Sequence, residues 1–268
     1  MPTVSIPRSV FLLKYRHLVD STADINFLYG GRDSGKSHFI AQRLIEDCLR
    51  LPYFRCLLIK KTYNSIGESQ WRTIKDIVEA WGLSSLFTFR TAPLSIECAN
   101  GNRFLARGCD DPQSIKSVKD PSHAWYEEGN MLTLDDFITV TTTLRTNRAK
   151  IQQWFSFNPE CDVDYEEFWL YKTFFDGKPQ EGIFKWTLKL DEKETVDFTY
   201  TTTHSTYHDN PHCTAERKIF LEQLKEIDPY YYQVYTLGKW GNRTIGDPYC
   251  ITFDKEKHVR PVVLQPRM

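Results

Sequence analysis

One stretch of eight residues near the amino terminus has the residue types and spacing of a phosphate-binding loop. It fits the pattern G-x-x-x-x-G-K-S and consists of Gly30, Gly31, Arg32, Asp33, Ser34, Gly35, Lys36 and Ser37. Glycines let backbone N–H groups surround an anionic phosphate, and a following helix adds the positive end of its dipole. In this pattern the lysine reaches the β- and γ-phosphates of a nucleotide and the serine hydroxyl ligates Mg²⁺. The stretch therefore predicts a site for ATP and Mg²⁺, with Lys36 in a catalytic role and Ser37 as a metal ligand.

Two consecutive carboxylates form the second candidate group. Glu127 and Glu128 directly follow a short apolar run, residues 122–126. At the end of a buried strand, one carboxylate can reach the Mg²⁺ shell while the next orients and deprotonates an attacking water. We assign Glu127 to the metal and Glu128 to catalysis. The alternative is a solvated acidic pair that merely ends a strand.

A third group lies at the tip of a later apolar run, residues 151–157. Ser156 and Asn158 are predicted to sense the γ-phosphate from the end of this strand, although Asn158-Pro159 is also an ordinary turn sequence. Phosphoryl transfer also needs positive charge near the transferred group. Arg32 is the candidate within the loop, and candidates that a neighbouring subunit would supply are Arg107, Lys116, Lys119, Arg145 and Arg148.

The segment before the loop, residues 1–24, contains a short helical piece at 11–18. Its Tyr15 or His17 could contact an adenine ring, and simple packing against the core is the alternative.

The elements that must position these groups alternate between strand and helix patterns. The loop lies between an apolar strand, 25–29, and a helical pattern, 38–45. Further strands are predicted at 55–61, 122–127 and 151–157, and helices at 69–81 and 133–144. Asn100-Gly101 predicts a hairpin that joins strands 95–98 and 103–106. Apolar strands separated by helices favour an α/β fold with a mainly parallel sheet and an antiparallel addition.

The last third of the chain changes character. A short amphipathic helix is predicted at 164–172, and two strands at 184–190 and 197–203 are expected to pair through a turn at 191–194. Helical segments at 214–227 and 229–237 then end at the sequence Gly238-Lys239-Trp240-Gly241. These patterns divide the chain into a P-loop domain, 1–205, a helical linker or lid, 206–245, and a tail, 246–268.

Composition narrows the class of protein. The 268 residues carry 34 Lys and Arg against 35 Asp and Glu, a balance that excludes a broadly basic nucleic-acid coat but not a local basic patch. Hydrophobic residues make up 41% of the chain, which is enough for a packed core. No apolar run approaches the ~20 residues that cross a bilayer. The seven cysteines are scattered and never in C-x-x-C spacing, so a reduced cytosolic protein without a zinc site is expected.

Together these motifs resemble the large terminase subunit of tailed bacteriophages, the DNA-packaging motor. The resemblance covers nearly the whole chain and rests on the phosphate loop and on five other segments, residues 107–117, 125–128, 155–159, 205–211 and 228–241. It implies a P-loop NTPase of the RecA-like (ASCE) type, with a mainly parallel central sheet flanked by helices, antiparallel additions and a small helical lid. It also implies an ATPase that moves viral double-stranded DNA into a procapsid.

The same resemblance implies partners and a place of action. Members of the family form a ring, usually a pentamer, on the portal protein of the procapsid, and they work with a small terminase subunit in the cytoplasm of the infected bacterium. They also carry a C-terminal nuclease with clustered metal-binding acids. After Trp240, Asp247 and Asp254 are too few to form such a cluster, so we expect no DNA cleavage by this chain and take the tail as leading to an absent nuclease domain.

Two other functions remain open at this stage. A helicase or other nucleic-acid translocase would usually need a second RecA-like domain, for which the chain has no room. A nucleotide-dependent switch protein would not need a catalytic carboxylate, and Glu128 argues against it.

Overall fold

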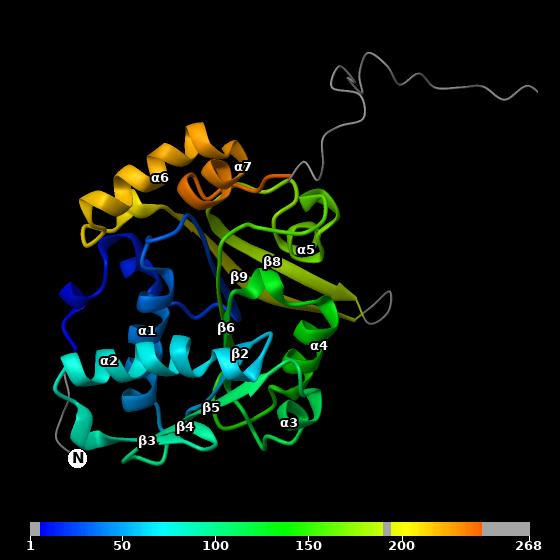
Figure 1. The fold of residues 1–268 in the computed structure, drawn as a ribbon. Coiled ribbons are helices and arrows are strands. Elements are labelled where there is room, and N and C mark those ends of the chain that lie inside the picture. The colour runs from blue at the N-terminus through cyan, green and yellow to red at the C-terminus, as the bar shows by residue number, and fades with distance from the viewer. Residues whose placement is uncertain (1–5, 190–193, 243–268) are drawn as a thin grey trace, which may run out of the picture.

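A single nine-stranded sheet organises the part of the chain that the computed structural model describes, residues 6–189 and 194–242 (Figure 1). The order of strands across it is β3-β4-β5-β2-β6-β7-β1-β9-β8. The strands are β1 (Ile25–Gly30), β2 (Arg55–Lys60), β3 (Phe87–Thr91), β4 (Leu94–Cys98), β5 (Arg103–Gly108), β6 (His123–Glu127), β7 (Gln152–Phe157), β8 (Gly182–Lys189) and β9 (Thr195–Ser205). The six strands from β5 to β9 in this order are parallel, and β3, β4 and β8 add antiparallel pairings at the two edges.

The central strands are apolar because helices cover both faces of the sheet. Every residue of β1 is buried, and its Phe27 lies in register with Phe155 of β7 and Thr202 of β9. Strands buried on both faces read as continuous apolar runs rather than as alternating ones. This is why the sequence identifies these strands readily.

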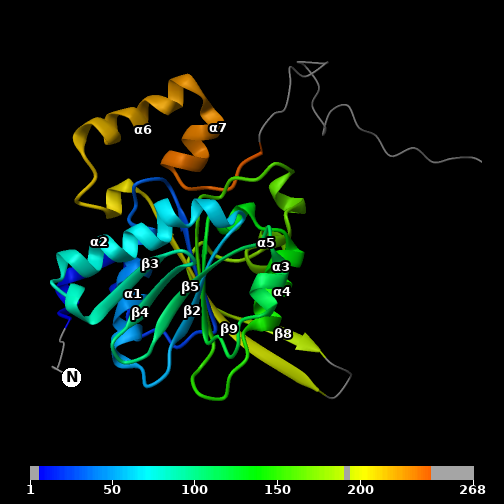
Figure 2. The same cartoon turned by 60° about the horizontal axis from the view of Figure 1, so that its bottom comes forward.

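Two helix layers complete the domain (Figures 1 and 2). One face is covered by α1 (Lys36–Arg50), α2 (Arg72–Ala80) and the amino-terminal 3₁₀ turns, and Trp125 and Trp154 of the sheet pack into this layer. The other face is covered by α3 (Pro112–Lys116), α4 (Leu134–Thr143) and α5 (Trp169–Phe174). Here the rings of Tyr126 and Phe155 stack with their centroids 4.0 Å apart. Neighbouring residues of one strand therefore anchor opposite layers.

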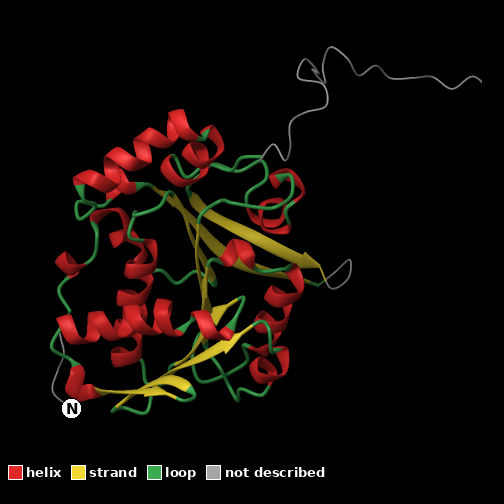
Figure 3. Ribbon diagram, viewed as in Figure 1, coloured by secondary structure: helices red, strands yellow, loops and turns green. Residues whose placement is uncertain are grey.

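The lid is a separate small cluster of helices at the carboxyl ends of the strands (Figure 3). It contains α6 (Ala215–Ile227), α7 (Pro229–Tyr231) and a π-helical turn, Tyr232–Thr236. The side chains of Thr214 and Asp228 cap α6 and α7. A core of its own lies under α6, formed by Tyr207, Cys213, Leu221 and Leu224. Thr214 and Asp228, the polar residues that precede α6 and α7, mark the start of these helices in the sequence as well as in the structure.

Most predicted elements are confirmed, but the helices predicted at 69–81, 164–172 and 229–237 differ in form. The last of these divides into α7 and the π-helical turn Tyr232–Thr236. The helix predicted at 164–172 is instead a 3₁₀ turn, Tyr165–Glu167, followed by an extended Phe168 and then α5. The side chain of Asp164 accepts a hydrogen bond from the N–H of Glu166, and this cap stabilises the short turn. The helix predicted at 69–81 begins as a π-helical turn, Gly67–Trp71, and strand β3 was not predicted.

The turn predicted at 191–194 lies mostly outside the described residues, and so do the tail from residue 246 and its Asp247 and Asp254. None of the helices within residues 6–189 and 194–242 is long and apolar enough to span a bilayer.

Candidate nucleotide site

The phosphate loop, the acidic pair and the tip of β7 meet at the carboxyl ends of the parallel strands. They line a cavity of about 420 Å³ together with one residue of the lid. Its lining residues are Arg32, Asp33, Ser34, Gly35, Lys36, Ser37, His38, Glu127, Glu128, Ser156, Phe157, Asn158 and Arg217. Ligands of open α/β sheets bind at this edge, outside the carboxyl ends of the strands. Gly30 and Gly31 lie behind the cavity, against the lid.

The loop turns through two left-handed residues before α1 begins. Asp33 has φ +57° and Gly35 has φ +86°, and Gly35 is the residue that precedes the first turn of α1. A Cβ at Gly35 would also lie 2.5 Å from Cδ1 of Leu12. The glycine of the G-K-S sequence is therefore required by its left-handed conformation, whereas the Leu12 side chain could rotate away from a Cβ.

Lys36 is folded against its own loop. Its Nζ donates to the carbonyls of Gly31 (2.6 Å) and Gly30 (3.3 Å) and to the hydroxyl of Ser34 (3.1 Å). Burial lowers the pKa of Lys36 to about 8, and the negative charges of Glu127 and Asp33 oppose this shift. A buried ammonium group with only neutral partners at hydrogen-bond distance is well placed to bind an anion.

The loop and the acidic strand are joined by one hydrogen bond. Ser37 Oγ donates to Glu127 Oε1 at 2.7 Å, although the two residues are far apart in the sequence. The other oxygen of Glu127 accepts from the Ser156 hydroxyl, which in turn accepts from Trp125 Nε1 at 2.8 Å. Burial raises the pKa of Glu127, while the bonds from Ser156 and Ser37 act in the opposite direction. A hydroxyl beside a carboxylate is a set of hard oxygen donors that fits Mg²⁺.

Glu128 has a different environment from Glu127. It has φ +54°, a left-handed conformation that is uncommon outside glycine, and its side chain is 60% exposed. Its carboxylate pairs with Lys60 Nζ at 3.0 Å, at the end of the neighbouring strand β2. Glu127 is thus fixed in the strand, whereas Glu128 lies at the mouth of the cavity with one charged partner.

Asn158 and Ser156 lie beside the loop, as predicted from their place at the tip of β7. Asn158 Nδ2 donates to the carbonyl of Gly30 at 2.6 Å, the same carbonyl that Lys36 contacts. Ser156 is buried and contacts the site through Glu127. Both residues therefore connect β7 to the groups expected to bind phosphate and metal.

The lid contacts the phosphate loop through backbone atoms. The N–H of Arg32 donates to the carbonyl of Tyr235 in the lid at 2.7 Å, and the N–H of Gly31 donates at 2.8 Å to the carbonyl of Ser205, the last residue of β9 before the lid. The guanidinium of Arg32 lies over the Tyr235 ring, 3.9 Å from its centroid. Gly238, with φ +64°, is so close that a Cβ there would lie 2.4 Å from the nitrogen of Gly31. The glycine of the predicted Gly238-Lys239-Trp240-Gly241 sequence is thus explained by contact with the loop.

The other candidate positive groups lie away from the cavity. Arg107 donates to the carbonyls of Ala106 and Ser114, and Arg148 lies over the Tyr53 ring at 3.9 Å. Lys116, Lys119 and Arg145 are exposed. Since none of the five is among the described residues that line the cavity, each remains a candidate only for a site on a neighbouring subunit.

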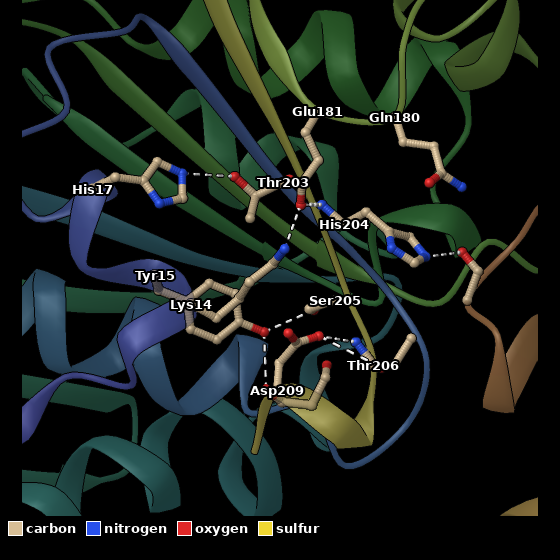
Figure 4. A network of polar contacts seen from close by, with 12 residues as sticks. Lys14, Tyr15, His17, Gln180, Glu181, Thr203, His204, Ser205, Thr206 and Asp209 are labelled. Atoms are coloured by element: carbon tan, nitrogen blue, oxygen red, sulfur yellow. Dashed lines mark hydrogen bonds and ion pairs between the residues drawn. The ribbon is translucent and has the colours of Figure 1, made fainter. Parts of the chain in front are cut away.

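Tyr15 connects the loop to the end of β9, and Figure 4 shows its hydroxyl beside Ser205. Its side chain is buried, and its hydroxyl bonds to the Ser34 carbonyl at 2.9 Å and to Ser205 Oγ at 2.7 Å. His17 lies 3.4 Å from Thr203 Oγ1 in the same network. Packing therefore accounts for Tyr15, which is not open to an adenine ring.

Sequence reasoning missed two charged residues of this region. Lys60 lies near the end of a predicted strand, and the observed strand order is what brings it beside the acidic pair. Arg217 comes from the first turn of a lid helix, and nothing in its sequence context distinguishes it from a solvated charge.

A phosphate loop between β1 and α1, with an acidic pair at the end of a parallel strand, defines the chain as a P-loop NTPase fold of the RecA-like type. The model of the phage terminase large subunit family matches residues 22–239, and the chain belongs to that family.

Two curated relatives have the same family description. The PBSX phage terminase large subunit of Bacillus subtilis (strain 168) is 28% identical over 218 residues, which are 80% of this chain and 49% of the relative. The terminase large subunit of Bacillus phage SPP1 is 26% identical over 205 residues, 75% of this chain and 44% of the relative. The chain thus spans about half the length of the curated relatives it matches.

Solved structures share the fold. The large terminase of a thermophilic bacteriophage has a TM-score of 0.65 at 19% identity, over 96% of this chain and 59% of that one. The same terminase in complex with ADP has a TM-score of 0.61 at 18% identity, over 97% and 58% of the two chains. The ATPase domain of the large terminase of Thermus phage P74-26 has a TM-score of 0.58 at 16% identity, over 83% and 90%.

Proposed function

We propose that this chain is the ATP-hydrolysing part of a viral genome-packaging motor that moves double-stranded DNA into a procapsid. The observation that carries the proposal is the 2.7 Å hydrogen bond between Ser37 and Glu127, with Glu128 as the next residue. It puts the hydroxyl of the phosphate loop, a carboxylate and a second, exposed carboxylate at one edge of the sheet. Membership of the terminase family supports the packaging role, and the ADP complex of the thermophilic phage terminase supports a nucleotide at this site.

Each group has a separate role in this proposal. Lys36 and the N–H groups at the start of α1 bind the phosphates of ATP, and Ser37 and Glu127 hold Mg²⁺. The metal ion supplies charge neutralisation of the phosphates. Glu128 orients the attacking water and accepts its proton, since it is the exposed carboxylate of the pair. Glu128 leaves Lys60 when it takes up this role. In this proposal residues 1–205 form the domain that binds the nucleotide, and residues 206–245 form the lid that moves.

Coupling between hydrolysis and motion runs through β7 and the loop. Ser156 is bonded to Glu127, and Asn158 is bonded to Gly30, so both sense changes in the groups that hold the phosphates. Additional positive charge comes from Arg32 of the same chain or from a residue of a neighbouring subunit. Arg32 starts from its place over Tyr235, so its use in catalysis would also move the lid contact.

The proposed partners follow from the family. They are double-stranded viral DNA, the portal protein, a small terminase subunit and further copies of this chain, which form a pentameric ring in the cytoplasm of the infected bacterium. A motor that moves along any sequence must contact DNA mainly through phosphates, so binding is expected to weaken steeply with salt.

The test of the proposed activity is an ATPase assay with Glu128→Gln. The exchange keeps the size of the side chain but removes the proton acceptor, so we expect turnover to fall at least about 100-fold, the usual contribution of a general base. ATP binding, measured by calorimetry, should be retained. Turnover close to the wild-type value would refute the assignment of Glu128, and a wild-type chain that binds no ATP would refute the proposed function itself.

A further inference from the structure

A lid arginine lies in the nucleotide cavity. Arg217 is in the first turn of α6, where its backbone N–H donates to the capping hydroxyl of Thr214. Its Nε and Nη2 both lie 2.8 Å from the same oxygen, Oδ2 of Asp33 in the phosphate loop. The side chain is 47% exposed, and it lines the cavity beside Asp33 of the loop.

The guanidinium has donors to spare. It carries five N–H groups in a fixed planar fork, and the pair with Asp33 uses two of them on one edge. Nη1 makes no hydrogen bond to any other residue in the described part of the chain. The unused edge is available to a planar or tetrahedral anion without loss of the bond to Asp33.

The charge balance of the cavity favours such a contact. Its lining arginine and lysine residues are Arg32, Lys36 and Arg217, and its carboxylates are Asp33, Glu127 and Glu128. A carboxylate within a phosphate loop repels phosphate, and Arg217 is the cation that neutralises it. Without Arg217 the carboxylate of Asp33 would have no cationic partner among the described residues.

Holding the lid to the loop does not by itself require Arg217. Asn210 Nδ2 already donates to the carbonyl of Asp33 at 2.7 Å, and Tyr235 accepts from the N–H of Arg32. Hydrogen bonds between uncharged groups thus attach the lid to the loop at Asp33 and at Arg32. What Arg217 adds is a charged donor among the residues that line the cavity where an anion is expected.

We propose that Arg217 is a nucleotide-contacting residue that bridges Asp33 and the phosphate chain of the bound nucleotide, so that the lid itself senses whether phosphate is present. The inference deepens the proposed function and rests on it, since it concerns the same site. Binding of nucleotide strengthens the attachment of α6 to the loop, and loss of phosphate weakens it.

The experiment is a double-mutant cycle on nucleotide affinity. The dissociation constants of AMP-PNP and ADP are measured by calorimetry for the wild-type chain and for Arg217→Gln, Asp33→Asn and the double variant. We expect Arg217→Gln to weaken AMP-PNP binding by about 10- to 100-fold, the range for a hydrogen bond to a charged group. The same loss is expected when Asp33 is already Asn, because the contact with phosphate does not depend on the pair. Lys218→Gln is the matched control, since it removes the same charge from the next residue of α6, and it should change affinity less than about twofold.

The outcomes separate a nucleotide contact from a structural clasp. If Arg217 only clasps Asp33, Arg217→Gln has no effect in the Asp33→Asn chain, and the inference is overturned. Loss for AMP-PNP alone supports contact with the γ-phosphate, and equal loss for ADP supports contact with the inner phosphates. A wild-type chain that binds neither nucleotide overturns the proposed function together with this inference, whereas wild-type affinity in all Arg217→Gln chains overturns the inference alone.

Discussion

Replacing Gly238 by alanine tests the backbone contact between the lid and the phosphate loop. A Cβ at this position would lie 2.4 Å from the nitrogen of Gly31 and 2.5 Å from Cα of Gly30, and both are backbone atoms that cannot rotate away. The residue also has φ +64°, which costs an alanine about 1–2 kcal/mol. Overpacking adds about 1–3 kcal/mol, so we expect a total destabilisation of about 2–5 kcal/mol.

Two other glycines separate the clash from the backbone strain. Gly82 and Gly177 have φ +68° and +66°, and a Cβ at either would meet nothing within 4 Å. Alanine there carries only the conformational cost. Since about 1 kcal/mol shifts the melting temperature of a domain of this size by about 2–4 °C, Gly238→Ala should melt roughly 2–12 °C below Gly82→Ala and Gly177→Ala.

The assay is thermal unfolding followed by circular dichroism, with ATP affinity measured on the same preparations. Gly238→Ala should also bind ATP more weakly than the two control variants, because the loop or the lid must shift to admit the methyl group. A melting temperature equal to that of the controls would refute the argument, since the contact would then yield without cost.

Two further predictions concern charges at the site. Lys60→Met should raise the basal turnover number about 1.5- to 5-fold with little change in KM, because it removes a partner that holds Glu128. Such partly exposed ion pairs are worth about 0.2–1 kcal/mol. A lower turnover number in steady-state assays would contradict the idea that Lys60 restrains Glu128. Burial lowers the pKa of Lys36 to about 8, below its unfolded value of about 10.4, so the charged form is disfavoured in the nucleotide-free protein and is restored when phosphate binds. ATP binding should therefore take up protons at pH 8.5 and far fewer at pH 7, and the affinity for ATP should fall as the pH rises above 8. Calorimetry in buffers of different ionisation enthalpy measures the proton uptake. Equal proton uptake at the two pH values would contradict this prediction.

The fold was largely predictable because its central strands are buried on both faces. The runs that became β1, β2, β6 and β7 each have apolar or aromatic residues at their centre and are almost entirely buried, and the caps Thr133 and Thr214 mark the start of their helices. Strand β3 was missed because an edge strand has one partner and a mixed, mostly exposed pattern. The break at Phe168 was missed because the helical periodicity of residues 164–172 does not reveal the cap formed by Asp164.

The residues of the site also fall into two groups, those that local spacing could predict and those that it could not. Residues that bind phosphate through the backbone occupy a fixed local sequence, so the loop and its flanking strand and helix could be identified from spacing alone. Contacts between distant segments carry no such spacing. The sequence assigned Ser37 and Glu127 to one metal ion but did not predict the bond between them, and the pairs formed by Lys60 and by Arg217 became visible only once the strand order and the position of the lid were known.

Ser205 ends β9 and accepts a hydrogen bond from Gly31, and the lid begins at the next residue. A movement of the phosphate loop would therefore reach the lid directly, because the residue bonded to Gly31 is followed at once by the first turn of the lid, Tyr207–Asp209, and its cap Thr206. Helix α6 has 13 residues and is about 20 Å long, so a rotation of about 10° at its base would carry its far end by roughly 3 Å. In the proposed motor, a displacement of a few tenths of an ångström at the phosphate loop would thus be amplified along α6, and the length of this helix would limit how far its end moves in one cycle.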